Sequence, residues 1–218
     1  IGVTGVQTCA LPIYLMRKAL LLQEKYQIVN TKIWDKNLGI NSHIGRIFDL
    51  FLGSPGLIVV EEDTSVNNAA LDFLVRNYKT DKSLAASAYV KRSHLDQESR
   101  LIGKTIFPNQ WGIAVSQEVM RKYLEVLSKQ RVSRVVIANS IQDLHGDSFS
   151  FWEVKKLTQW WYNHFFFCIL HGNWADAVIQ YSVMALGGHY VVPASSLVKD
   201  VTLPFDERAM TPRDPTLL

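Results

Sequence analysis

The spacing of apolar residues along the chain changes repeatedly between a helical and an extended pattern. Ser116, a residue type that caps helix N-termini well, directly precedes one helical segment. Apolar positions three or four residues apart predict helices over residues 14–26, 44–52, 67–78, 117–127, 151–170 and 174–186. Alternating or continuous apolar runs predict strands over residues 27–34, 57–60, 83–89, 132–138 and 189–192. Because strands alternate with helices, we expect an α/β domain with a mostly parallel sheet flanked by helices.

Three consecutive acidic residues, Glu61, Glu62 and Asp63, follow the apolar run at 57–60. That run is typical of a central parallel strand buried on both faces, and ligands of open α/β sheets bind beyond the carboxyl ends of such strands. A divalent cation such as Mg²⁺ or Mn²⁺ would offset the mutual repulsion of the three carboxylates. The alternative is a solvated acidic turn before a helix N-terminus, where negative charge is also favoured.

The first residues have a different origin from the rest. Residues 3–13 match the in-frame translation of a common sequencing-library adapter. We therefore expect residues 1–13 to be an artefact and residues 14–218 to form a single domain. The native sequence then begins inside this domain, so the N-terminal strand of the sheet is expected to be missing.

Composition places the chain among globular proteins. It has 218 residues, of which 48% are hydrophobic and 20% charged, and this excludes a disordered, collagen-like or coiled-coil protein. The net charge is +3 and the basic residues are scattered, so we expect no nucleic-acid partner. With Cys9 in the adapter-like stretch, Cys168 is the one native cysteine, which excludes an internal disulfide and a cysteine-based zinc site.

The chain contains no apolar run near the ~18–20 residues that cross a bilayer. We expect residues 14–218 to be soluble, with no membrane span. Its compartment is unknown from the sequence, and a cytoplasmic location follows if the chain is bacterial.

A strand that ends in paired acids also begins the receiver domain of response regulators. Such a domain needs a second strand ending in Asp and, later, a Lys-Pro pair. Here Asp96 follows polar residues, and no Lys precedes a Pro. The receiver interpretation is therefore disfavoured.

A broader set of motifs extends from about residue 37 to residue 202. The set comprises Asn37-Leu38-Gly39, Val59-Val60-Glu61-Glu62-Asp63, Trp111-Gly112, Asn173-Trp174-Ala175-Asp176, and Pro193 with Ser196-Leu197-Val198. In this order and spacing it resembles the GT-A-fold (Rossmann-like) glycosyltransferases that use nucleotide sugars. The bacterial sugar transferases of the hemolytic-protein type are the better match, and N-acetylglucosaminyltransferase I is a more distant one. The resemblance implies a metal-dependent enzyme that moves a sugar from a nucleotide-diphosphate donor to a glycan or other hydroxyl acceptor.

The resemblance also implies roles for the acidic residues. Glu61, Glu62 and Asp63 match the family's form of the DXD motif, usually Glu-Asp-Asp, which holds Mn²⁺ (or Mg²⁺) against the nucleotide diphosphate. Asp63 matches the metal-binding position, and Glu61 and Glu62 match positions that contact the nucleotide sugar. Glu62 replaces the usual Asp, and its extra methylene shifts the carboxylate.

An inverting transferase needs a carboxylate that takes the proton of the acceptor hydroxyl. In the eukaryotic relatives this acid directly follows the late Trp. Here Ala175 follows Trp174, and the acid comes next, at Asp176, about 100° further round a helix. Asp176 is the candidate base, and its alternative is a helix N-terminal acid stabilised by the helix dipole. The next candidates are Asp200 and Asp206.

Further donor contacts are expected at Trp111, Gly112, Trp174 and Arg46. The tryptophans would stack on sugar rings, and the Arg46 guanidinium would pair with the diphosphate, whereas the alternatives are core tryptophans and a surface arginine. The aromatic segment 151–170 is either a membrane-surface or acceptor-binding helix or, because its aromatics occur all round the helix, a buried core element.

The alternative function is that of a non-catalytic GT-A-like relative that binds a sugar or nucleotide. Glu62 and the shifted Asp176 favour it, whereas Glu61 and Asp63 favour the enzyme.

Overall fold

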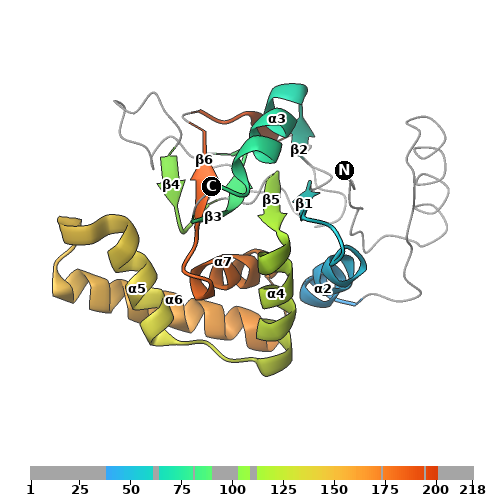
Figure 1. The fold of residues 1–218 in the computed structure, drawn as a ribbon. Helices are drawn as coiled ribbons and strands as arrows, with labels where there is room; N and C mark the ends of the chain where they lie inside the picture. Colours follow the sequence, from blue (N-terminus) through green and yellow to red (C-terminus); the bar gives the residue numbers. More distant parts are fainter. Residues whose placement is uncertain are drawn as a thin grey trace.

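The computed structural model describes residues 38–60, 64–80, 82–89, 103–108, 112–172, 174–193 and 195–200. These segments form helices and strands, which Figure 1 colours in chain order. The helices are α2 (Ile40–Leu50), α3 (Asn68–Asn77), α4 (Gln117–Lys129), α5 (Arg134–His145), α6 (Phe151–His171) and α7 (Ala175–Ala185), with a 3₁₀ turn at Gly146–Ser148. The strands are β1 (Gly56–Val59), β2 (Thr64–Val66), β3 (Ser83–Ser87), β4 (Gly103–Thr105), β5 (Ile113–Ser116), β6 (His189–Val192) and β7 (Val198–Asp200).

The central sheet has the strand order β1-β5-β3-β6-β4. Only β3 and β6 pair in parallel, whereas β1 with β5, β3 with β5, and β4 with β6 pair antiparallel. The sheet is therefore mixed and mostly antiparallel, and the prediction of a mostly parallel sheet is wrong. The reason is that β5 lies between β1 and β3 and runs against both, while β4 runs against β6. β1, β3 and β6 still share one direction.

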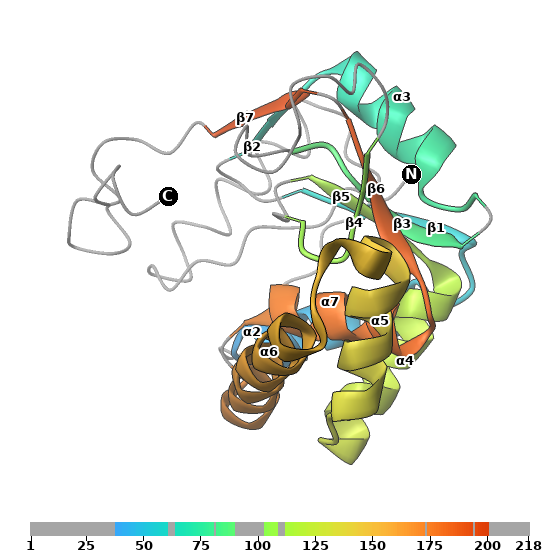
Figure 2. The same ribbon diagram turned by 90° about the vertical axis from the view of Figure 1, so that its left-hand side faces the viewer.

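The sheet separates two layers, as Figure 2 shows. On one face lie α3 and the antiparallel pair β2–β7, over a small apolar cluster that includes Ile58, Leu74 and Ala114. On the other face lie α2, α4, α5, α6 and α7, over the main core. The coarse prediction of an α/β domain with helices flanking a sheet is confirmed.

Local signals decide several of these elements. Ser116 caps α4 by accepting a hydrogen bond from the backbone N–H of Val119, as predicted. The strand predicted at 132–138 is wrong, because α5 begins there with Ser133 as its N-cap. Ile137 and Ile141 of α5 are fully buried, so tertiary packing outweighs the strand preference of the Val-Val-Ile run.

Helix α6 begins with a capping box formed by Ser150 and Glu153 and ends at Gly172, whose φ of 69° suits a left-handed C-cap. Only one side of the helix is buried, around Phe165, Cys168 and Ile169. The prediction of an aromatic helix buried all round is therefore wrong. Within the helical layer α6 packs mainly on α5 and α7, and its opposite side stays exposed.

No helix within the described segments is long and apolar enough to cross a membrane.

Candidate functional site

The strands that share a direction end at one edge of the sheet. β1, β3 and β6 finish there at Val59, Ser87 and Val192, and the antiparallel β5 begins there. Val59, Gly112 and Pro193, which belong to three of the predicted motifs, therefore lie at or next to strand ends at this edge. The prediction that the acidic triple belongs to the binding edge depends on the shared direction of β1, β3 and β6.

Gly112 is linked to the motif at 193–198 through hydrogen bonds to the backbone of Ala88. It has a φ of 68°, and its carbonyl accepts a hydrogen bond of 2.9 Å from the N–H of Ala88. The positive φ favours glycine here, and a Cβ at this position would meet Cγ1 of Val198 of β7 at an ordinary contact distance of 3.4 Å. The N–H of Leu197 in turn donates to the carbonyl of Ala88 over 2.9 Å. Gly112 and the Leu197-Val198 pair are thus neighbours.

The chain directly after the acidic triple lies in the same region. Thr64 starts β2 and pairs with Asp200 of β7, so residue 64 is held beside the C-terminal motif. Glu61, Glu62, Asp63 and Trp111 lie outside the described residues, and their roles stay predictions. Asp206, a reserve candidate for the base, also lies outside them.

No group of three or more His, Cys, Asp or Glu side chains that could hold a metal ion occurs in the parts of the chain that are described. The predicted Mn²⁺ or Mg²⁺ site therefore depends on the carboxylates of residues 61–63. The structure describes the residues on either side of the acidic triple: Val60 directly follows β1, and Thr64 starts β2.

Asp176 lies in the first turn of α7, a helix whose other residues are almost all buried against the core. The residue keeps some accessible surface, but burial of its carboxyl group raises the pKa from the ordinary 3.8 to about 6. A helix N-terminus alone would lower the pKa of a carboxyl group. Desolvation therefore outweighs the helix dipole here, contrary to the simple helix-start interpretation.

Three groups from other elements surround Asp176. Burial in the first place, and the negative charge of Asp176 in the second, raise the pKa of the Tyr123 hydroxyl, of the Tyr190 hydroxyl and of the Cys168 thiol. These groups belong to α4, β6 and α6 respectively. The Asp176 carboxyl thus lies where three helices meet the sheet.

Hydrogen bonds fix the framework around this carboxyl group. The Tyr123 hydroxyl donates to the carbonyl of Asn41 over 3.0 Å, and Asn41 Nδ2 donates to the carbonyl of Cys168 over 3.2 Å. These two bonds tie the start of α2 to α4 and α6. The Tyr190 hydroxyl, by contrast, is fully buried and has no hydrogen-bond partner among the described residues.

The sequence interpretation missed Tyr123 and Tyr190. Tyr123 follows the apolar spacing of α4, and Tyr190 stands in the apolar run of β6, so both have the pattern of core residues. Only the fold shows that they share the surroundings of Asp176.

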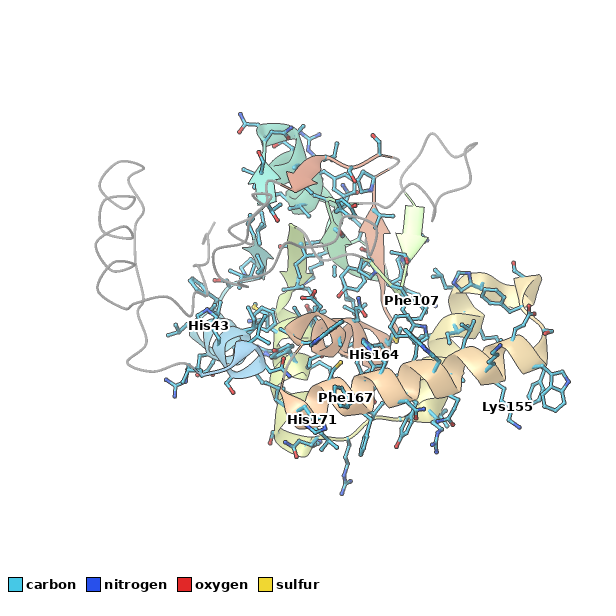
Figure 3. All side chains as sticks on the ribbon, turned by 180° about the vertical axis from the view of Figure 1, so that it is seen from behind. His43, Phe107, Lys155, His164, Phe167 and His171 are labelled. Atoms are coloured by element: carbon cyan, nitrogen blue, oxygen red, sulfur yellow. The ribbon has the colours of Figure 1, made fainter. Side chains whose placement is uncertain are left out.

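Trp174 is 57% exposed, which excludes a place in the core. Its indole contacts the His164 ring edge-on, with centroids 5.6 Å apart, and His164 stacks on Trp160 at the same distance. Figure 3 shows His164 on α6, close to α7. An aromatic surface therefore leads from α6 to the start of α7, two residues from Asp176.

Arg46 lies on the exposed side of α2, opposite the buried Gly45, Ile47 and Phe48. Its predicted pairing with a diphosphate stays a prediction.

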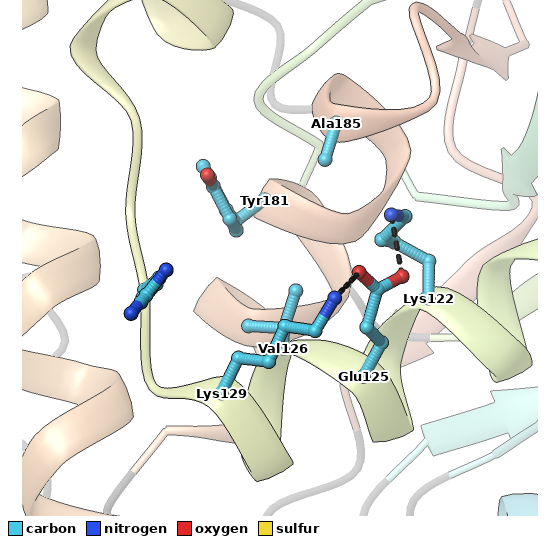
Figure 4. A pocket seen from close by; sticks show the side chains of 7 residues that line it. Lys122, Glu125, Val126, Lys129, Tyr181 and Ala185 are labelled. Atoms are coloured by element: carbon cyan, nitrogen blue, oxygen red, sulfur yellow. Dashed lines mark hydrogen bonds and ion pairs between the residues drawn. The ribbon is translucent and has the colours of Figure 1, made fainter.

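A cavity of about 110 Å³ opens between α4 and α7, away from the predicted site residues (Figure 4). Glu125 at its wall accepts hydrogen bonds from Lys122 at 2.6 Å and Lys129 at 2.7 Å, and these lower its pKa to about 2. Tyr181 lines the same cavity, and its hydroxyl accepts a hydrogen bond from the N–H of Ser133. Glu125, its two lysine partners and Tyr181 thus bind one another or the backbone.

A comparison with protein-family models gave no match, and a search of curated proteins found none that matches.

Proposed function

We propose that this chain is a GT-A-like domain of a metal-dependent glycosyltransferase, with Asp176 as the general base. It would move a sugar from a nucleotide-diphosphate donor to a glycan or other hydroxyl acceptor. The observation that carries the proposal is the buried Asp176 carboxyl with its pKa raised to about 6. Perturbed carboxyl groups of this kind cluster at functional sites.

The proposed base takes the proton of the acceptor hydroxyl as the hydroxyl oxygen attacks the anomeric carbon of the donor sugar. The bond from the anomeric carbon to the nucleoside diphosphate breaks, and the electron pair leaves with the diphosphate. A carboxylate whose pKa is about 6 is mostly ionised at neutral pH and is a stronger base than one at 3.8. The raised pKa therefore serves proton abstraction directly.

Other residues would position the substrates. The exposed face of Trp174 is available for a sugar ring two positions from the base. Glu61, Glu62, Trp111 and Gly112 would contact the nucleotide sugar, and the Arg46 guanidinium would pair with its diphosphate. Asp63 would hold the Mn²⁺ or Mg²⁺ ion, which neutralises the charge that develops on the leaving diphosphate.

The convergence of the motifs supports the proposal. Gly112, Leu197 and the chain on either side of residues 61–63 meet at one sheet edge, although they are far apart in the sequence. A nucleotide sugar bound at this edge would contact all of these motifs at once.

The experiment compares Asp176→Asn with the unchanged protein. Transfer from a panel of nucleotide sugars should fall by about 10²–10⁴-fold, the usual cost of removing a general base. Binding of a nucleoside diphosphate with Mn²⁺, measured by calorimetry, should stay the same. Asp143→Asn, a change at an exposed acid of α5, is the matched control and should leave both properties unaltered.

Two results would count against the proposal. Normal transfer by Asp176→Asn would remove Asp176 from the reaction. Nucleotide binding without any transfer by the unchanged protein would favour the non-catalytic alternative.

A further inference from the structure

The outward side of α6 carries large exposed apolar side chains towards both of its ends, with the exposed pair Gln159 and Asn163 between them. Trp152, Trp160, Phe166, Phe167 and Leu170 are all exposed, and their positions recur at helical spacing, so they share one face. This outward face of α6 extends over about 27 Å of helix between residues 152 and 170. Single exposed apolar residues are ordinary on protein surfaces, but five large exposed apolar side chains gathered on one face of one helix mark an interaction site.

The rings of this face are held by the folded domain. Trp160 stacks on His164, and the neighbouring Trp161 stacks on Phe107 with centroids 3.9 Å apart. On the opposite side of the helix Phe165 and Cys168 are buried in the core. The outward face of α6 is therefore presented without any rearrangement of the helix.

The charge of the face is positive. Lys155 and Lys156 lie among the aromatic residues, and the Lys155 ammonium is 5.3 Å from the centre of the Trp152 ring. In Figure 3, Lys155 lies towards one end of α6 and Phe167 towards the other. Glu153, the single carboxylate in the α6 sequence, accepts hydrogen bonds from the N–H and hydroxyl of Ser150, so it is turned to the helix start.

We propose that the outward face of α6 binds the surface of an anionic phospholipid membrane, with the helix lying parallel to the bilayer plane. Tryptophan favours the boundary between headgroups and acyl chains because its ring is apolar and its N–H is polar. Lysines beside the rings reach the lipid phosphates while their stems stay on apolar surface. Trp152 and Phe167 would enter the boundary region, and Lys155 and Lys156 would meet the phosphates.

A second copy of the chain fits this face less well. A two-fold contact through the face would oppose two surfaces that each carry Lys155 and Lys156, with Glu153 already held by its own cap. The positive charge instead complements an anionic lipid surface. This inference does not depend on the proposed transferase activity.

The test is flotation of the full chain with lipid vesicles. We expect binding to vesicles of phosphatidylcholine mixed with phosphatidylglycerol, weaker binding to phosphatidylcholine alone, and a decline in binding as salt rises. Lys155→Gln with Lys156→Gln should weaken binding to the mixed vesicles by about thirtyfold, since each lysine near an anionic surface contributes about fivefold. Trp152→Ser with Phe167→Ser should abolish binding to both kinds of vesicle.

The matched control is Leu50→Ser with Val75→Ser, because these residues are exposed on α2 and α3 and lie away from α6. This variant should bind vesicles like the unchanged chain. Thermal unfolding by circular dichroism should show that every variant remains folded.

Absence of vesicle binding, or binding that persists in Trp152→Ser with Phe167→Ser, would overturn the proposal. So would a dimer, detected by sedimentation, that this double substitution dissociates while no vesicle binding occurs. That result would assign the face to a second copy.

Discussion

Replacing Asp176 with Asn should stabilise the protein at neutral pH. The pKa of this carboxyl group rises from 3.8 to about 6 on folding, because burial disfavours the charged form. The folded state therefore binds the proton more tightly than the unfolded state does. Well below pH 3.8 both states are protonated and the group costs nothing, whereas above pH 6 the folded state bears the full cost of holding the charge.

The shift from 3.8 to about 6 corresponds to about 3 kcal/mol of unfolding free energy. This value is an upper bound, since Asp176 keeps some accessible surface. Asparagine has nearly the same shape and no charge to desolvate. Asp176→Asn should thus gain up to about 3 kcal/mol at pH 7, or about 6–12 °C in Tm for a chain of this size. If Asp176 were instead stabilised by the helix dipole, the same substitution would lower the unfolding free energy by about 0.3–1 kcal/mol.

The assay is urea unfolding of both proteins at pH 4 and pH 7, followed by tryptophan fluorescence. The difference in unfolding free energy should be only about 0.5 kcal/mol at pH 4, where the unfolded carboxyl is partly ionised, and should strongly favour the variant at pH 7. Asp143→Asn on α5 controls for the loss of one negative charge and should change stability by less than about 0.5 kcal/mol at either pH. A variant that is less stable at pH 7, or a gain that does not depend on pH, would refute the reasoning.

Two further predictions concern the sheet edge. Gly112→Ala should destabilise the fold by about 1–2 kcal/mol for its backbone conformation, and by about as much as Gly172→Ala, because both glycines have a similar positive φ and the added Cβ at residue 112 meets Val198 only at an ordinary contact distance of 3.4 Å; no loss in urea unfolding would refute the left-handed conformation of Gly112. Mn²⁺ with a nucleoside diphosphate should raise the Tm of the protein, and Asp63→Asn should abolish the increase while the Tm without ligand stays nearly constant; an undiminished increase would exclude Asp63 as a ligand.

The sequence predicts the positions of most described helices. Among the described strands it predicts β1, β3 and β6 but not β2, β4, β5 or β7, and it does not predict how the strands run. Ser116 marks the start of α4 because its cap is a local interaction. The strand error at 132–138 arises because the preference of a Val-Val-Ile run is local, whereas α5 is decided by distant contacts. One of these is the Tyr181 hydroxyl, which accepts from the N–H of Ser133 across 48 positions. Strand direction depends in the same way on long-range placement, here on β5 lying between β1 and β3.

The candidate site likewise has one part that a local sequence pattern predicts and another that depends on long-range contacts. Asp176 is recognisable from its place after Trp174, because that relation spans two residues. Its burial and its proximity to Tyr123 and Tyr190 depend on α4 and β6, which no local pattern connects to α7. The sequence left open whether the aromatic segment 151–170 is a surface helix or a core element, since an aromatic residue has the same pattern whether its neighbour is core or solvent.

The burial of α7 raises the pKa of Asp176, and it also supplies the packing energy that offsets the cost of the buried charge. Val178, Ile179, Val183 and Met184 are buried around the same helix, and each contributes about 1.5–3 kcal/mol relative to an exposed position. Together they exceed the cost of about 3 kcal/mol for ionising one carboxyl group. A shallower α7 would leave Asp176 near its ordinary pKa and make it a weak base. On the proposed function, the packing that fixes this helix is therefore also what adjusts its carboxylate for proton transfer.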